Sequence, residues 1–169
     1  MRSAFPTGGI VFFVALLGLG LILQPVIAEA QRPIKVGILD TYTGPPAVYG
    51  QDALNGFKLA LSEINKKGVL GTKIEFTNRD DKFKVDIALS MAKELVMNEK
   101  VDLLVGTINS GVSLAISDYA KEEKIPFIVW ISKTEKITGE KGHRYVFSTA
   151  ENTYMAGKAG GLPFPRSLM

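Results

Sequence analysis

Short apolar runs alternate with helix-like patterns along most of the chain, and this alternation limits the fold more than any other feature. A strand is expected wherever a short apolar or alternating run is bounded by turn residues: 34–39, 73–77, 101–105, 125–130 and 145–147. Apolar side chains at three- and four-residue spacing predict amphipathic helices: 53–64, 85–96 and 112–119. The order β-α-β-α-β-α-β-β implies right-handed crossovers and a mainly parallel sheet covered on both faces, a three-layer α/β fold.

The first thirty residues have the pattern of a secretory signal peptide. Arg2 gives a positive start, an apolar run occupies residues 10–23, and Ala28-Glu29-Ala30 offers small residues where a signal peptidase cuts. The run is shorter than the roughly 20 residues that span a bilayer, which favours cleavage after Ala30, or after Ala28, over an uncleaved anchor. Cysteine is absent, which excludes a lipid anchor on a cysteine. We therefore expect a periplasmic or otherwise extracytoplasmic protein that is not a lipoprotein.

Composition excludes several classes of function. The absence of cysteine rules out a disulfide, a thiol nucleophile and cysteine-ligated metal, and we expect neither a resident metal nor a cofactor. The formal charge is +3, but lysines alternate with acids, as in Lys121-Glu122-Glu123-Lys124, which argues against a nucleic-acid partner.

In a parallel sheet, ligands bind at the carboxyl ends of the strands, so any catalytic pattern is expected in the loops there. The loop after the first strand has prolines at 45 and 46 and no glycine-rich phosphate motif. Asp40, Asp80 and Asp81 are compatible with a magnesium-dependent hydrolase, or else Asp80 and Asp81 cap the next helix or face solvent. His143, the only histidine, lies in a polar turn and is expected to be solvated. We expect no enzyme.

The loop of residues 107–113 leads directly into a helix and is rich in small residues. Ser110 and Gly111 would leave the first N–H groups of that helix without partners, and such N–H groups form a binding site for a carboxylate. The alternative is that Asn109 or Ser110 only caps its own helix.

The mature chain resembles the amino-terminal part of periplasmic substrate-binding proteins of branched-chain amino-acid ABC importers, the type I periplasmic binding fold. The resemblance extends over roughly residues 34–154 and is carried by short motifs in a fixed order: 34–37 with 43–45 and 49–50, 56–60 with 64–65 and 68, 106 with 109–112, and 124–128.

The resemblance implies a receptor that binds a small ligand between two lobes and delivers it to ABC permease subunits in the membrane. It also implies a set of ligand-binding residues: Ser110, Asn109 and Gly111 at the start of the third helix, Ser132 and Lys133 after the fourth strand, Tyr49 after the first strand, and Tyr154 past the first crossover. Trp130-Ile131-Ser132-Lys133 stands where relatives carry smaller residues, which leaves another small carboxylate, an amide or an aromatic acid open beside a branched-chain amino acid.

The resemblance divides the chain into a signal peptide (1–30), the first part of lobe I (31–150), and a crossover with a truncated or aberrant start of lobe II (151–169). Because relatives of this family are longer, we expect a partial receptor that binds its ligand poorly by itself. The ligand-binding lobe of an extracellular sensor and the hydrolase based on Asp40 remain as alternatives.

Overall fold

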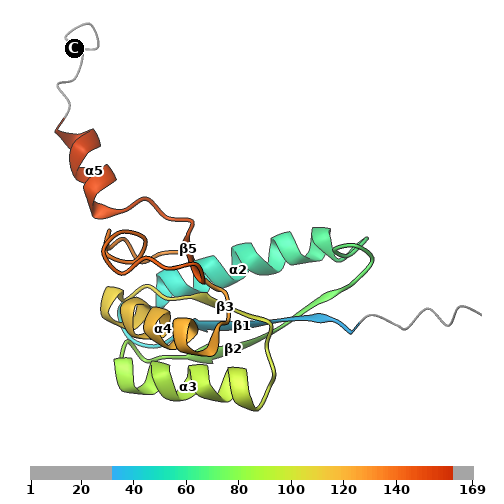
Figure 1. Cartoon of the computed structure of the whole chain (residues 1–169). Helices are drawn as coiled ribbons and strands as arrows, with labels where there is room; N and C mark the ends of the chain where they lie inside the picture. The colour runs from blue at the N-terminus through green and yellow to red at the C-terminus, as the bar shows by residue number, and fades with distance from the viewer. Residues whose placement is uncertain (1–31, 162–169) are drawn as a thin grey trace, which may run out of the picture. The chain divides into compact units, whose positions relative to one another are not determined.

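The computed structural model describes residues 32–161 (Figure 1). The expected signal peptide lies outside the described residues, so its presence and its cleavage site stay predictions. No helix within residues 32–161 has both the length and the hydrophobicity needed to cross a membrane.

A single sheet of five parallel strands organises the described residues. The strands are β1 (Ile34–Asp40), β2 (Ile74–Asp80), β3 (Leu103–Gly106), β4 (Phe127–Val129) and β5 (Val146–Ser148). Their order in the sheet is β2-β1-β3-β4-β5, so the direction of winding reverses between β1 and β3. In open parallel sheets, this reversal leaves a crevice at the carboxyl ends of the two strands, where ligands bind.

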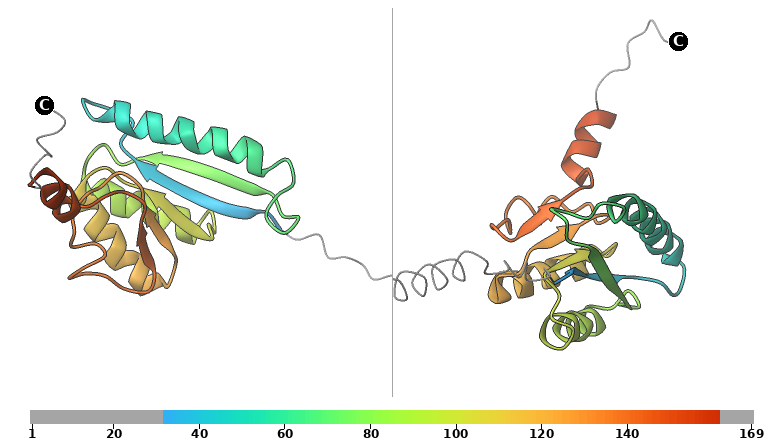
Figure 2. Two further views of the ribbon diagram at one scale, coloured as in Figure 1. Left: turned by 90° about the horizontal axis from the view of Figure 1, so that it is seen from above. Right: turned by 90° about the vertical axis from the view of Figure 1, so that its right-hand side faces the viewer.

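Helices cover both faces of the sheet, as the alternating pattern predicts. The helices that cover the sheet are α2 (Ala47–Ile64), α3 (Val85–Met97) and α4 (Ser110–Glu123), whereas α5 (Thr153–Gly160) has no buried residue. Figure 1 and the right-hand view of Figure 2 show α2 on one side of the sheet and α3 with α4 on the other. The larger apolar core lies under α3 and α4 and includes the fully buried Leu95, Ile116 and Phe127. This arrangement confirms the predicted three-layer α/β architecture.

The α2 helix begins earlier than its apolar spacing predicts, at Ala47 instead of Ala53. Pro46 occupies the N-cap position with φ −80°, a geometry that suits the entry to a helix, where a backbone N–H has no helical partner in any case. The prolines that indicate a loop in the sequence therefore also start the helix. As a result, Tyr49 lies on the first turn of α2 and not in a free loop.

Gly106, the last residue of β3, brings the backbone of that strand close to β1. Its φ is +137°, and a Cβ at this position would lie 2.0 Å from the carbonyl oxygen of Leu39. Only glycine fits both the conformation and the space. The close approach sets the two strand ends, and the loops that leave them, side by side at the point where the winding reverses.

Candidate ligand-binding site

A hollow of about 480 Å³ opens at the carboxyl ends of the strands. It is lined by Tyr49, Ile108, Ser110, Ile131 and Lys133. These residues come from α2, from the segment between β3 and α4 together with the first residue of α4, and from the segment after β4. The structure thus brings together Tyr49, Ser110 and Lys133, three residues that the resemblance implies and that lie far apart in the sequence.

Two hydroxyl groups meet at this hollow. The Ser132 hydroxyl donates a hydrogen bond of 3.1 Å to the hydroxyl oxygen of Ser110, and Ser132 is only 3% exposed. The backbone N–H of Ser132 also donates to the carbonyl oxygen of Thr107 at 3.1 Å. Since the Ser110 oxygen accepts this hydrogen bond, its own hydroxyl hydrogen can point to an acceptor in the hollow. Ser132 thus holds the Ser110 oxygen in position through this hydrogen bond.

Asn109 caps α4, as the capping alternative predicts. Its side-chain oxygen accepts from the N–H groups of Gly111 at 2.8 Å and Val112 at 3.4 Å. The expectation that the first N–H groups of α4 are open is therefore wrong for these two residues. Gly111 is exposed, and neither it nor Asn109 lines the hollow. The cap instead fixes the direction in which the first turn of α4, with Ser110, faces the hollow.

Lys133 provides positive charge at the rim of the hollow. Its ammonium group pairs with Glu151, and its carbonyl oxygen accepts the N–H of Thr153 at 2.7 Å. The side chains of Lys133 and Glu151 are about half exposed, at 53% and 55%. An exposed ion pair of this kind is weak, so the lysine can exchange Glu151 for a bound anion at little cost.

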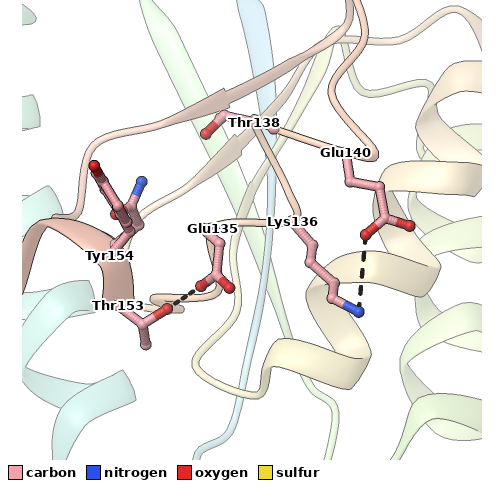
Figure 3. Close-up of a pocket in the computed structure, with 8 residues that line it drawn as sticks. Glu135, Lys136, Thr138, Glu140, Thr153 and Tyr154 are labelled. Atoms are coloured by element: carbon pink, nitrogen blue, oxygen red, sulfur yellow. Dashed lines mark hydrogen bonds and ion pairs between the residues drawn. The ribbon is translucent and has the colours of Figure 1, made fainter. Parts of the chain in front are cut away.

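Tyr154 lies apart from the other residues implied by the resemblance. It is on α5, is 65% exposed and lines a different hollow of about 680 Å³. Figure 3 shows this second hollow, in which Thr153 donates to Glu135 and Lys136 faces Glu140 at 3.9 Å. The structure does not bring Tyr154 to the hollow at Ser110, and a ligand contact by this residue stays a prediction.

Asp40 is fully buried and contacts Ile108, one of the residues that line the hollow, although it carries a carboxylate. One oxygen accepts the N–H groups of Thr41 at 2.8 Å and Ile108 at 3.1 Å, and the other accepts the indole N–H of Trp130 at 2.5 Å. Burial raises the pKa of Asp40 to about 6, although these hydrogen bonds oppose the rise. The sequence offered no signal for this contact beyond the unusual tryptophan at position 130.

The two acids at the end of β2, Asp80 in the strand and Asp81 after it, have structural partners. One oxygen of Asp80 accepts the N–H groups of Tyr42 and Lys82, at 3.0 and 2.9 Å. One oxygen of the fully buried Asp81 accepts from the hydroxyl of Thr41 at 2.6 Å and the N–H of Phe83 at 2.8 Å. Neither acid caps α3, whose N-cap is Lys84. The expectation that these acids cap the next helix is therefore wrong, and the expectation that they face solvent is wrong for the buried Asp81.

Within residues 32–161, no group of three or more acidic or histidine side chains is placed to hold a metal ion. These contacts give no support to the hydrolase alternative.

His143 also differs from its expectation as a solvated residue. Its ring is partly buried, and Nε2 contacts the hydroxyl and the carbonyl oxygen of Ser117 on α4, at 2.9 and 3.0 Å. The ring therefore packs the turn before β5 against α4. This contact is structural and does not involve the hollow.

Sequence and structure comparisons agree on one family. Residues 33–164 match the family model described as periplasmic binding protein. Over 97 residues the chain is 35% identical to the Leu/Ile/Val-binding protein BraC3 of Rhizobium johnstonii. The matched stretch covers 57% of this chain and 26% of that protein. The chain spans about a quarter to a third of the length of the curated relatives it matches.

Two solved structures resemble this one and contain ligands. A solute-binding protein of an ABC transporter from R. palustris, in complex with benzoate, has a TM-score of 0.70 and 31% identity, over 75% of this chain and 35% of that one. A substrate-binding protein of a branched-chain amino acid transporter from Streptococcus pneumoniae, in complex with isoleucine, has a TM-score of 0.66 and 31% identity, over 72% of this chain and 34% of that one.

Proposed function

The chain belongs to the periplasmic binding protein family, and on that premise we propose that its hollow at Ser110 binds the carboxylate of a small solute for an ABC importer. The observation that carries the proposal is the hydrogen bond from Ser132 to Ser110, which leaves the Ser110 hydroxyl hydrogen to donate to an anion. The N-terminus of α4 and the ammonium group of Lys133 add positive potential on the same side.

The ligand class follows from what the similar proteins hold. Isoleucine and benzoate, the ligands of the two structures above, share only a carboxylate and an apolar body. Tyr49, Ile108 and Ile131 give the hollow apolar walls that suit such a body. An aromatic or a branched aliphatic carboxylate therefore fits better than a sugar or a metal ion.

The setting of this function follows from the family. The relatives are periplasmic binding proteins, and we propose the same extracytoplasmic location for this chain, with ABC permease subunits as its membrane partners. An extracellular sensor lobe remains the second candidate, because sensors reuse this fold. A genomic neighbourhood with permease and ATPase genes would favour import, whereas a downstream membrane segment with a kinase would favour the sensor.

A direct test is an NMR titration of the chain with benzoate, isoleucine and, as the matched control, benzamide. The hollow is open to solvent and encloses a ligand on one side, so we expect millimolar affinity and no heat signal at micromolar concentration in calorimetry. The amide signals of Ser110 and Lys133 should move with the carboxylates and not with benzamide. Equal shifts with benzamide, or shifts confined to residues outside the hollow, would contradict a carboxylate site.

A further inference from the structure

A buried carboxylate contacts both of the segments that carry the hydroxyl pair of the hollow. Ile108 lies two positions before Ser110, and Trp130 lies two positions before Ser132. Asp40 accepts a hydrogen bond from each of these neighbours, from the N–H of Ile108 and from the indole of Trp130. One carboxylate at the end of β1 therefore contacts both segments, in addition to the direct backbone hydrogen bond from Ser132 to Thr107.

The rest of the surroundings keeps this carboxylate in place. The Trp130 ring packs edge-on against Phe57 of α2, with 6.4 Å between ring centroids, which fixes the direction of its N–H. Gly50, on the first turn of α2, has no room for a side chain, since a Cβ there would lie 2.3 Å from the carbonyl oxygen of Thr41 and 3.5 Å from the carboxyl carbon of Asp40. The first turn of α2 therefore packs closely over Asp40, which is fully buried.

We propose that Asp40 is a positioning residue for ligand binding. Its charge holds the β3–α4 segment and the segment after β4 at the separation that lets Ser132 donate to Ser110. The inference rests on the proposed carboxylate site, but the contacts that carry it are independent of any ligand.

Protonation is the natural way to weaken this connection. A neutral carboxyl is a weaker acceptor than a carboxylate for the N–H of Ile108 and the indole of Trp130. Burial, with the charge of Asp81 adding to it, brings the pKa of Asp40 to about 6. The other titratable groups near it are Asp80 and the phenol of Tyr42, whereas the groups that approach it from the remaining elements, Gly50, Ile108 and Trp130, do not titrate.

The test compares the wild-type chain with Asp40→Asn, titrated with benzoate from pH 5 to pH 7.5. The variant keeps the volume but cannot accept from both partners, so we expect about tenfold weaker binding at pH 7.5 without a lower melting temperature. Wild-type affinity should fall towards that of the variant below pH 6, and the variant should show no such change. The control is His143→Gln, which removes the only imidazole and should retain the wild-type profile. Wild-type affinity in Asp40→Asn at pH 7.5, or a loss of affinity and stability together at that pH, would overturn the positioning role.

A second measurement needs no ligand and keeps this inference separate from the proposed function. Trp130 is the only tryptophan, so its indole N–H gives a single assigned NMR signal. In the wild-type chain this signal and the amide signals of Ile108 and Ser110 should shift together with a midpoint near pH 6. If no carboxylate binds the wild type, the proposed function fails, and this common titration still decides the role of Asp40. Separate midpoints, or a Ser110 signal that stays constant, would refute the connection.

Discussion

The hydroxyl of Ser132 donates to the hydroxyl of Ser110 across 3.1 Å, which joins the segment after β4 to the first residue of α4 although 22 positions separate the two serines. The contact exists because β3 and β4 are neighbours in the sheet and end at the same edge. Because the Ser110 oxygen accepts this bond, its own hydroxyl hydrogen can donate to an acceptor in the hollow.

Replacing either serine should weaken carboxylate binding through different routes. Ser110→Ala removes the donor itself, and we expect a loss of affinity of about ten- to a hundredfold, since a hydrogen bond to a charged group contributes roughly 1.5–3 kcal/mol. Ser132→Ala removes only the support of Ser110 and should have a smaller effect. NMR titration with benzoate measures both, with Ser90→Ala on the exposed face of α3 as the control. Unchanged affinity in Ser110→Ala would be incompatible with the proposed site.

Tyr49 should set the preference between aromatic and aliphatic carboxylates. Its ring lines the hollow from the first turn of α2 and is 59% exposed, so it can stack on an aromatic ligand without moving the core. Tyr49→Leu should weaken benzoate by several-fold, because an aromatic pair adds about 0.5–1.5 kcal/mol, and should change isoleucine little. Tyr49→Phe, which keeps the ring, should bind both ligands as the wild type does. Equal losses for both ligands in Tyr49→Leu would show that the ring provides only general apolar contact.

Asp40 should make the stability of the chain depend on pH in an unusual direction. Because its pKa rises from the ordinary 3.8 to about 6, its contribution is complete below pH 4 and is lost as the pH rises to about 6. The loss amounts to roughly 3 kcal/mol for this fully buried carboxyl. Chemical denaturation of the wild type and Asp40→Asn at a series of pH values should show this difference between them.

Other acids act in the opposite sense, which is why the comparison with Asp40→Asn is needed. A side-chain hydrogen bond from Arg32 lowers the pKa of Asp102, so its contribution is lost as the pH falls. Burial raises the pKa of Asp80, but hydrogen bonds from the N–H groups of Tyr42 and Lys82 outweigh burial and leave the pKa below its ordinary value. Both acids are present in the two proteins, so their effects cancel in the difference. A difference that is constant from pH 4 to pH 7 would contradict the raised pKa of Asp40.

Two glycines on α2 should respond to alanine in opposite ways. Gly50 packs against the end of β1, where a Cβ would lie 2.3 Å from the carbonyl oxygen of Thr41, so Gly50→Ala should destabilise the chain by about 2 kcal/mol or more. Gly56 has no atom within 4 Å of such a Cβ, and Gly56→Ala should stabilise α2 by roughly 0.5–1 kcal/mol. Thermal unfolding of the two variants measures both effects, and a similar melting temperature for the pair would show that α2 does not pack closely on Thr41.

The sequence determines the layers of this fold because local patterns encode them. Residues 34–39 form a short apolar run, and residues 85–96 have apolar side chains at helical spacing. β1 and α3 form there within one residue of the expected bounds. The end of a strand differs from its expected position where a neighbouring strand pairs with additional residues. β2 continues to Asp80 because Asp80 pairs with Asp40 at the end of β1, a partner that no local pattern reveals.

In the candidate site, too, some features are recognisable from the local sequence and others depend on the tertiary structure. Asn109 is recognisable as a cap from its neighbours alone, and the motifs carried by Ser110, Ser132 and Tyr49 suffice to nominate them. Only the tertiary structure decides that Ser132 supports Ser110, that Tyr154 lies at another hollow, and that Asp40 holds Ile108 and Trp130 together. The physical reason is that strand order and crossover geometry bring these groups within hydrogen-bond distance, whereas local sequence specifies the elements but not which distant side chains meet at their ends.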